Sequence, residues 1–297
     1  MKTVKDSYPL RIDNVEIPLI SLKTSKEGPK ILLTACMHGD EKGSNAVAKQ
    51  LLKALENNLN NGEIYVFPLL NPIGFKQNSR LFNKIDLNDS FPGKEKGNLT
   101  QKIAYKIFTK IVQIKPDLVL DLHNDWKKSI HYALIDPKQK DTAEKIYNKT
   151  IQFGKSLTIP FVLDTDNLEN SLSFQLLKNN IPSLVIELER VDEGVKLLLN
   201  FLSSLSMLKH KTEMNIRPEV RGKLLKYSLG PLASKEGFVK FLTLPGKIVE
   251  KGYPLAQIID HPKVIETLYS QDKAIVLSLT DSVKIKPKEQ VVALGIL

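Results

Sequence analysis

The sequence predicts an α/β fold followed by a small β-rich region at the carboxyl terminus. Up to about residue 212, short apolar runs that are typical of buried strands alternate with amphipathic stretches of helical length. Beyond that point, short strand-like segments are separated by turns rich in Gly, Pro and Lys. We therefore expect two domains, one spanning residues 1–212 and a β-rich one spanning residues 213–297.

The first domain is expected to be an α/β sandwich in which helices cover a largely buried sheet. Its strand-like runs are short and almost wholly apolar, as strands covered on both faces are. The expected strands are 31–35, 64–70, 118–122 and 181–186, with a further strand-like run from His131 and Tyr132. The expected helices are 44–56, 99–114, 141–157 and 192–208.

A linker, residues 209–222, is expected where the two domains join. Segments 237–260 and 274–295 alternate between apolar and polar residues, as half-buried strands do. We expect this small β domain either to cap the active site or to mediate oligomerisation. In the second case the protein would be a homo-oligomer.

Composition sets outer bounds on function. With 42% hydrophobic and 26% charged residues among 297, the chain has the make-up of an ordinary soluble protein. Its net charge of +10 comes from scattered lysines without a nucleic-acid-binding motif, and no run of 18 apolar residues occurs. One cysteine and no signal-peptide pattern favour a reducing compartment. We therefore expect a cytoplasmic protein that binds neither nucleic acid nor membrane.

The candidate metal ligands are His38, Glu41 and His123. His38 and Glu41 follow the first apolar run, and His123 follows the run 118–122. Two strands that end side by side would bring the three together at the carboxyl edge of the sheet. Two nitrogens and one carboxylate can hold a catalytic zinc and leave a position for water. The alternative is structural, because an HxxE pair often occurs by chance and a strand-end histidine often only packs.

Two further residues are candidates for catalysis. Arg80 lies in a loop dense in Asn, Gly and Pro, where its guanidinium could stabilise an oxyanion; otherwise it is a surface residue paired with Asp86 or Asp89. Glu187 ends the run 181–186, where its carboxylate could move a proton; otherwise it belongs to a solvated ion-pair cluster.

Taken together, these motifs resemble the succinylglutamate desuccinylase/aspartoacylase family, a branch of the zinc carboxypeptidase superfamily. The resemblance extends across residues 30–190 and rests on HGDE (38–41), NPIGFKQNSR (71–80), DLNDSFPG (86–93), DLHND (121–125) and PSLVIELE (182–189). It implies a zinc-carboxypeptidase-like α/β/α sandwich with a mixed sheet. It also implies one zinc ion per chain, held by His38, Glu41 and His123, with Arg80 polarising the scissile carbonyl. Asn88 would contact substrate, and Glu187 would be the general base and acid.

Two positions depart from the family's pattern. Asp89 stands where the family has an arginine that grips a substrate carboxylate, and Glu189 stands where it usually has a glycine. Because Asp89 would repel a carboxylate, we expect the substrate to present an amine, a guanidinium or a neutral group there. Asn124, which follows His123, is a further candidate for substrate contact.

The expected activity is that of a zinc-dependent amidohydrolase acting on an N-acylated amino acid or another amine-containing small molecule. A metallocarboxypeptidase that cleaves a peptide or a peptidoglycan stem is the alternative among enzymes, although Asp89 does not favour it. A non-catalytic module that binds a metal or another ligand is the alternative from a different class.

Overall fold

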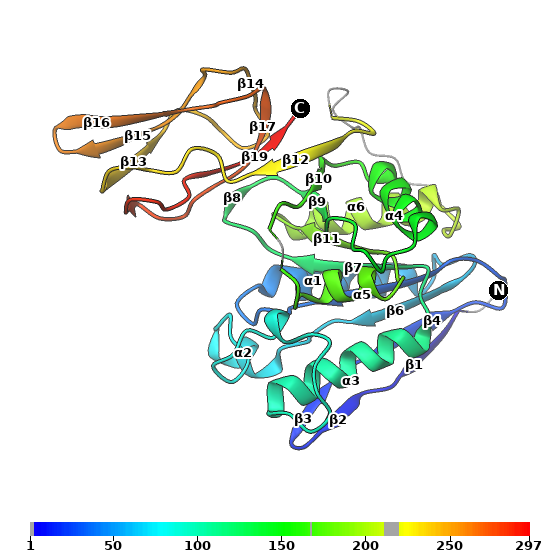
Figure 1. Cartoon of the computed structure of the whole chain (residues 1–297). Coiled ribbons are helices and arrows are strands. Elements are labelled where there is room, and N and C mark those ends of the chain that lie inside the picture. The colour runs from blue at the N-terminus through cyan, green and yellow to red at the C-terminus, as the bar shows by residue number, and fades with distance from the viewer. Residues whose placement is uncertain (1–2, 167, 211–219) are drawn as a thin grey trace.

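The computed structural model describes residues 3–166, 168–210 and 220–297. A large mixed sheet crosses the molecule, and helices cover both of its faces in the amino-terminal part (Figure 1). The helices are α1 (Lys42–Leu55), α2 (Pro72–Gln77), α3 (Leu99–Ile114), α4 (Glu144–Ser156), α5 (Leu172–Lys178) and α6 (Val191–Ser204), with the 3-10 turn η1 (Asn88–Ser90). The strands of this part are β1 (Val4–Ser7), β2 (Leu10–Ile12), β3 (Val15–Ile17), β4 (Ile20–Lys23), β5 (Lys30–Ala35), β6 (Glu63–Phe67), β7 (Leu118–His123), β8 (Lys128–Ser129), β9 (Tyr132–Ile135), β10 (Phe161–Leu163) and β11 (Ser183–Glu187).

The strand β5 explains the layered architecture. Alternate side chains of a strand point to opposite sides of the sheet. In β5, apolar residues lie on both sides. Ile31 and Leu33 join the core formed with α1 and α6, whereas Leu32 joins the core formed with α3 and α5. The expected α/β/α sandwich is therefore confirmed.

The four predicted helices are present as α1, α3, α4 and α6, with shifted ends for all but α3. Helix α3 begins at a capping box, in which Asn98 accepts from the N–H of Gln101 while the Gln101 side chain accepts from that of Asn98. The short helices α2 and α5 were not predicted, because one or two turns carry too little periodicity to be recognised.

The central strand order brings the carboxyl ends of four parallel strands together. Strand β5 runs parallel to β6 on one side and to β7 on the other, and β7 runs parallel to β11. The last residue of β5, Ala35, pairs with Leu122, one residue before His123. The expectation that the two ligand-bearing strands end side by side is thus confirmed.

The carboxyl-terminal residues are β-rich, as expected. Their strands are β12 (Leu224–Ser228), β13 (Gly237–Phe241), β14 (Ile248–Val249), β15 (Pro254–Asp260), β16 (Lys263–Tyr269), β17 (Ala274–Leu279), β18 (Lys284–Ile285) and β19 (Val292–Ile296). Strand β12 pairs with β10, so β12, β19, β17 and β14 continue the large sheet, while β16, β15, β13 and β18 form a separate antiparallel sheet. Most of the predicted linker, with the boundary between residues 212 and 213, lies outside the described residues.

None of the helices within the described ranges combines the length and the apolar character needed to span a lipid bilayer.

Candidate active site and metal centre

The HGDE segment forms the turn between β5 and α1. Its path depends on close packing at Gly39, where an added Cβ would lie 2.0 Å from the carbonyl carbon of Gly74. Cys36 starts the turn with a φ of 55°, and its N–H donates to Ser44 Oγ at 3.0 Å. Glu41 occupies the N-cap position of α1. The turn therefore holds His38 and Glu41 on one side, at the carboxyl end of the sheet.

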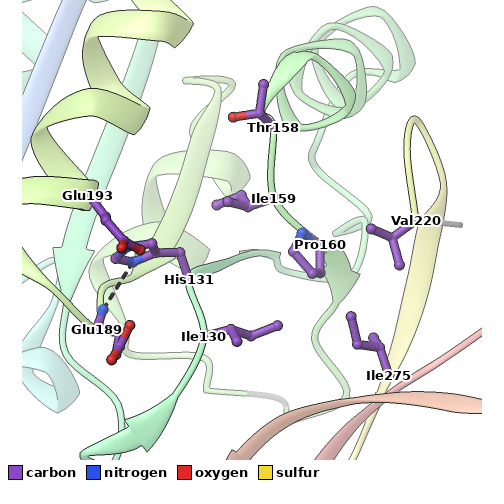
Figure 2. Close-up of a pocket in the computed structure, with 9 residues that line it drawn as sticks. All are labelled: Ile130, His131, Thr158, Ile159, Pro160, Glu189, Glu193, Val220 and Ile275. Atoms are coloured by element: carbon purple, nitrogen blue, oxygen red, sulfur yellow. Dashed lines mark hydrogen bonds and ion pairs between the residues drawn. The ribbon is translucent and has the colours of Figure 1, made fainter. Parts of the chain in front are cut away.

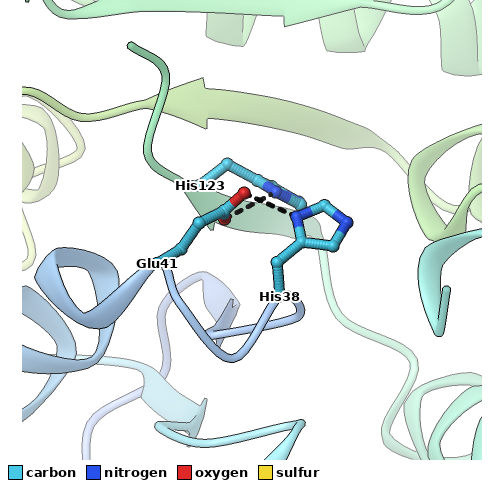
Figure 3. A group of neighbouring side chains, drawn as sticks. All are labelled: His38, Glu41 and His123. Carbon is cyan, nitrogen blue, oxygen red and sulfur yellow. Dashed lines mark hydrogen bonds and ion pairs between the residues drawn. The ribbon is translucent and has the colours of Figure 1, made fainter. Parts of the chain in front are cut away.

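His38, Glu41 and His123 converge in a compact group (Figure 3). The Nδ1 atom of His38 lies 2.5 Å from Glu41 Oε1, and the Nδ1 atom of His123 lies 3.1 Å from Glu41 Oε2. The two imidazole centroids are 5.0 Å apart. Both histidines are buried. The same nitrogen of each ring thus faces the shared carboxylate.

The other nitrogen of each ring faces a second carboxylate. Asp86 Oδ1 lies 3.2 Å from His38 Nε2, and Asp121 Oδ2 lies 3.1 Å from His123 Nε2. Asp121 is itself held by Thr34, whose hydroxyl donates to Oδ1 at 2.6 Å. Sequence reasoning did not identify Asp121, although an acid two residues before His123 in an otherwise apolar strand points to the same face of the sheet.

Neighbouring charges and burial change the proton affinities of this group. Burial raises the pKa of Glu41, but the facing imidazoles of His123 and His38 outweigh it and lower the pKa. Burial lowers the pKa of His38, but Asp86 and Glu41 outweigh it and raise the pKa. Without a cation, the paired carboxylates and imidazoles thus stabilise one another's charged forms.

The donor set fits a zinc ion. Two imidazole nitrogens and one carboxylate are the ligands of many catalytic zinc sites. Ligand histidines typically donate their second ring N–H to a carboxylate, which sets the tautomer and the orientation of the ring. Asp86 and Asp121 lie at ion-pair distance from those nitrogens, although neither contact has hydrogen-bond geometry in the described structure. His38 and His123, through Nδ1, and Glu41 would therefore hold the metal. The Nε2 atoms of the two histidines lie toward Asp86 and Asp121.

Arg80 lies beside this group and is held by Asp86. Its Nε donates to Asp86 Oδ2 at 2.9 Å, and its Nη1 lies 3.7 Å from Glu41 Oε1. The backbone of Arg80 is fixed by Asn71, whose amide donates to the Arg80 carbonyl at 3.2 Å while its oxygen caps α2 through Gly74. Asp86 therefore orients both His38 and Arg80, and the guanidinium keeps solvent access, with 54% of its side chain exposed.

Glu187 ends β11 and stands next to His123 in the sheet. The two residues are paired across the parallel strands β11 and β7. Glu187 Oε2 is buried without a hydrogen-bond partner among the described residues. Burial raises the pKa of Glu187 well above its ordinary value, and the favourable contribution of His123 does not offset this. A carboxyl group with an unpaired oxygen beside the ligand group is placed to accept and return a proton.

The three residues considered for substrate contact differ in their surroundings. Asn124 is engaged on both ends of its amide: Oδ1 accepts from Ser44 N–H at 2.8 Å, and Nδ2 donates to the Leu188 carbonyl at 2.8 Å. Asn88 accepts from the N–H of Leu172, at the start of α5. Asp89 is exposed on η1 and makes no ion pair with any described residue.

Cys36 lies two residues before His38 but is buried, and its Sγ contacts the His38 carbonyl at 3.4 Å. Burial and the nearby acids raise the pKa of the thiol to about 12. Because the thiolate is the reactive form, Cys36 is a packing residue of the turn.

A family model and several known proteins resemble this chain. The model of the succinylglutamate desuccinylase/aspartoacylase catalytic domain matches residues 27–203. A curated relative, the N-alpha-acetyl-L-2,4-diaminobutyric acid deacetylase of Halomonas elongata, is 23% identical over 258 residues, which cover 83% of this chain and 75% of the relative.

Solved structures share the fold over the whole chain. An aspartoacylase family protein from Mesorhizobium loti superposes with a TM-score of 0.82 at 20% identity, covering 100% of this chain and 95% of the other. The product-bound ectoine utilization protein EutE (DoeB) from Ruegeria pomeroyi superposes with a TM-score of 0.78 at 21% identity, covering 100% and 96%. Since the catalytic-domain model matches more than half of the chain, over the segment that contains the converging ligands, Arg80 and Glu187, the chain belongs to the succinylglutamate desuccinylase/aspartoacylase family.

Proposed function

We propose that this chain is a zinc-dependent deacylase that hydrolyses the amide bond of an N-acylated amino acid or another amine-containing small molecule. One observation carries the proposal: the Nδ1 atoms of His38 and His123 face one carboxylate while their Nε2 atoms face two others. Histidines that bind zinc through one ring nitrogen are typically oriented by a carboxylate near the other.

The chemistry follows from the residues around the ligand group. A zinc ion held by His38, Glu41 and His123 would supply Lewis acidity, which acidifies water and polarises a carbonyl. Glu187 accepts the proton of the attacking water on its unpaired Oε2 and returns it to the departing amine nitrogen. Arg80, oriented by Asp86, donates to the oxygen on which negative charge develops.

Asn124 connects the segments that carry the proposed base and the proposed metal ligands. Its amide joins the first turn of α1, through Ser44, to Leu188, the residue after Glu187. Its backbone N–H lies 3.3 Å from Glu41 Oε2. Gly43 makes room for it, because a Cβ there would lie 2.7 Å from Asn124 Nδ2. We assign Asn124 a positioning role that links the proposed base to the proposed ligands.

The substrate presents a cationic or neutral group to Asp89. Asp89 lies on η1, next to the loop that precedes α5, since Phe91 N–H donates to the Asn170 carbonyl and Asn88 accepts from Leu172. The Halomonas elongata relative is named for a substrate derived from diaminobutyric acid, which has a second amine. This supports an acylated diamino compound as the substrate class, with Asp89 near its free amine.

We also propose that residues 213–297 form a domain that shapes the entrance of the site. Strand β8, in the loop after His123, pairs with β17. The N–H of Lys127 lies 3.2 Å from both carboxylate oxygens of Asp281, and Lys128 Nζ lies 4.7 Å from the ring of Phe241. The carboxyl-terminal residues therefore hold the loop that follows His123.

The test is metal analysis of the purified chain followed by hydrolysis of a panel of N-acetyl amino acids, N-acetyl diamino acids and short peptides, with and without a chelator. We expect about one zinc per chain and chelator-sensitive release of acetate, fastest from acylated diamino compounds. Hydrolysis confined to the carboxyl-terminal bond of peptides would instead support a metallocarboxypeptidase. A zinc-loaded protein that hydrolyses nothing in the panel would count against the proposal.

A further inference from the structure

A second polar site lies apart from the proposed metal ligands, in a cavity of about 170 Å³. Its lining comes from the residues just before β9, the connection between α4 and β10, the segment that leads from β11 into α6, the residues before β12 and strand β17 (Figure 2). The cavity is small against the roughly 300–1,000 Å³ of most ligand pockets, so its ligand is small. The lining residues are Ile130, His131, Thr158, Ile159, Pro160, Glu189, Glu193, Val220 and Ile275.

His131 is the central polar group of this cavity. It is 8% exposed, and its Nδ1 accepts from the N–H of Glu189 at 3.0 Å, the dashed contact in Figure 2. Burial lowers the pKa of His131, so the ring carries one proton at neutral pH. Because Nδ1 is the acceptor, that proton is on Nε2.

The Nε2–H of His131 has no hydrogen-bond partner among the described residues, and the nearest carboxylate oxygen, Glu193 Oε2, is 3.8 Å away. Thr158 Oγ1, in the same lining, is also buried without a partner. Buried polar groups are rarely left unpaired, so these two groups in one cavity are open to a hydrogen bond with a bound molecule or with water.

The tautomer argues against a metal ion. His131, Glu189 and Glu193 each offer one ligand atom within 4.8 Å of the others, which superficially suits a cation such as zinc. Histidine binds metals through a nitrogen without a proton. Here Nδ1 is occupied by a backbone donor and Nε2 carries the proton, so neither nitrogen of His131 is available.

The charges favour an organic cation. Arg190 pairs with Asp192 and with Glu193 Oε1, both at 3.3 Å, but forms no ion pair with Glu189 among the described residues. The three carboxylates of Glu189, Asp192 and Glu193 therefore share one guanidinium, and Glu189 has no cationic partner among the described residues. The opposite wall is apolar and consists of Ile130, Ile159, Val220 and Ile275.

We propose that this cavity binds a small amino compound with a branched apolar portion and a neutral oxygen. Its ammonium group faces Glu189 and Glu193, its oxygen accepts from His131 Nε2–H and contacts Thr158, and its alkyl group packs on the isoleucine wall. Glu189, whose backbone N–H donates to His131, supplies a carboxylate without a cationic partner among the described residues.

Calorimetric titration of the full chain with valinol tests the proposal, because this amino alcohol has all three features. We expect saturable binding of one valinol, weakened at least about tenfold by Glu189→Gln, since a charge-assisted contact is lost. Isobutylamine, which lacks the oxygen, and 3-methylbutanol, which lacks the amine, should each bind more weakly. His131→Phe should also weaken binding. Because Glu189 is exposed, Glu189→Gln tests the site without disturbing the fold.

Asp141→Asn is the matched control, because it alters an exposed acid that does not line the cavity and should leave valinol affinity unchanged. Because the experiment measures binding without turnover, its outcome is separate from that of the proposed deacylase activity. Equal valinol affinity in the wild type and Glu189→Gln, or no binding to the wild type, would overturn the proposal. So would a second equivalent of zinc that Glu189→Gln removes, because this would identify a metal site.

Discussion

Glu187 and His123 are paired residues on the neighbouring parallel strands β11 and β7. On its other side, Glu187 is paired with Tyr132 of the antiparallel strand β9, and the Tyr132 hydroxyl donates to Asp125 at 2.7 Å. Adjacent strands are held about 4.8 Å apart by their backbone hydrogen bonds. The sheet, rather than a flexible loop, therefore sets the spacing between the proposed base and a proposed metal ligand.

The first prediction concerns Glu187. Glu187→Gln keeps the size of the side chain but cannot accept the proton, so we expect kcat to fall by about 10²–10⁴ while zinc content stays near the wild-type value. His123→Ala should instead lose both zinc and activity. Steady-state kinetics and metal analysis of the same preparations separate the two effects, and loss of zinc from Glu187→Gln would contradict its assignment as the base.

The second prediction concerns Asp86. Asp86→Asn removes the charge that orients both His38 and Arg80, so we expect zinc affinity to fall by about 10–100-fold. Asp89→Asn, in the same loop, is the control because the Asp89 side chain is exposed and forms no ion pair with either residue. Competition with a chromogenic chelator measures both affinities; equal values for the two variants would show that Asp86 does not support the ligands.

The third prediction concerns substrate choice at Asp89. Asp89→Arg replaces a carboxylate with a guanidinium, which attracts carboxylates and repels amines. We expect kcat/KM for an N-acetyl diamino acid to fall at least about tenfold relative to that for an N-acetyl amino acid with an acidic side chain. Parallel kinetics on both substrates provide the ratio. An unchanged ratio would remove Asp89 from the recognition site.

The fourth prediction concerns the pH dependence of stability. Burial raises the pKa of Asp136 to about 7, against about 3.9 for an unfolded aspartate. The stability associated with protonated Asp136 is therefore present below pH 4 and is lost as pH rises through 7. Asp136→Asn should remove this loss and stabilise the protein at pH 8.5 by roughly 2–4 kcal/mol.

Thermal unfolding across pH 4–9 measures this effect. The Tm difference between Asp136→Asn and the wild type should grow between pH 4 and 7 and then level off. The exposed Asp141 offers a control, since Asp141→Asn should leave the Tm unchanged at every pH. A Tm difference that stays constant with pH would show that ionisation of Asp136 is not responsible.

Much of the architecture around the site was predictable because it is encoded locally. Dense apolar runs predicted β5, β7 and β11. The residues at the carboxyl ends of these strands, or just beyond them, lie at one edge of the sheet. The first strands, β1 to β4, were not predicted, because each has only three or four residues and several of these are exposed. The continuation of the main sheet through β12 was also missed, since strand pairing depends on residues far apart in the sequence.

The sequence by itself determined which side chains stand at strand ends, because the apolar periodicity of a strand is a local property of its residues. It identified His38, Glu41, His123 and Glu187 as candidates in this way, and Arg80 from the polar loop in which it lies. Only the tertiary structure decided which ring nitrogen faces Glu41, that Asp121 and Asp86 stand behind the histidines, and that Glu189 meets His131. These relationships depend on strand register and on contacts between distant segments, which the packing of the whole sheet sets.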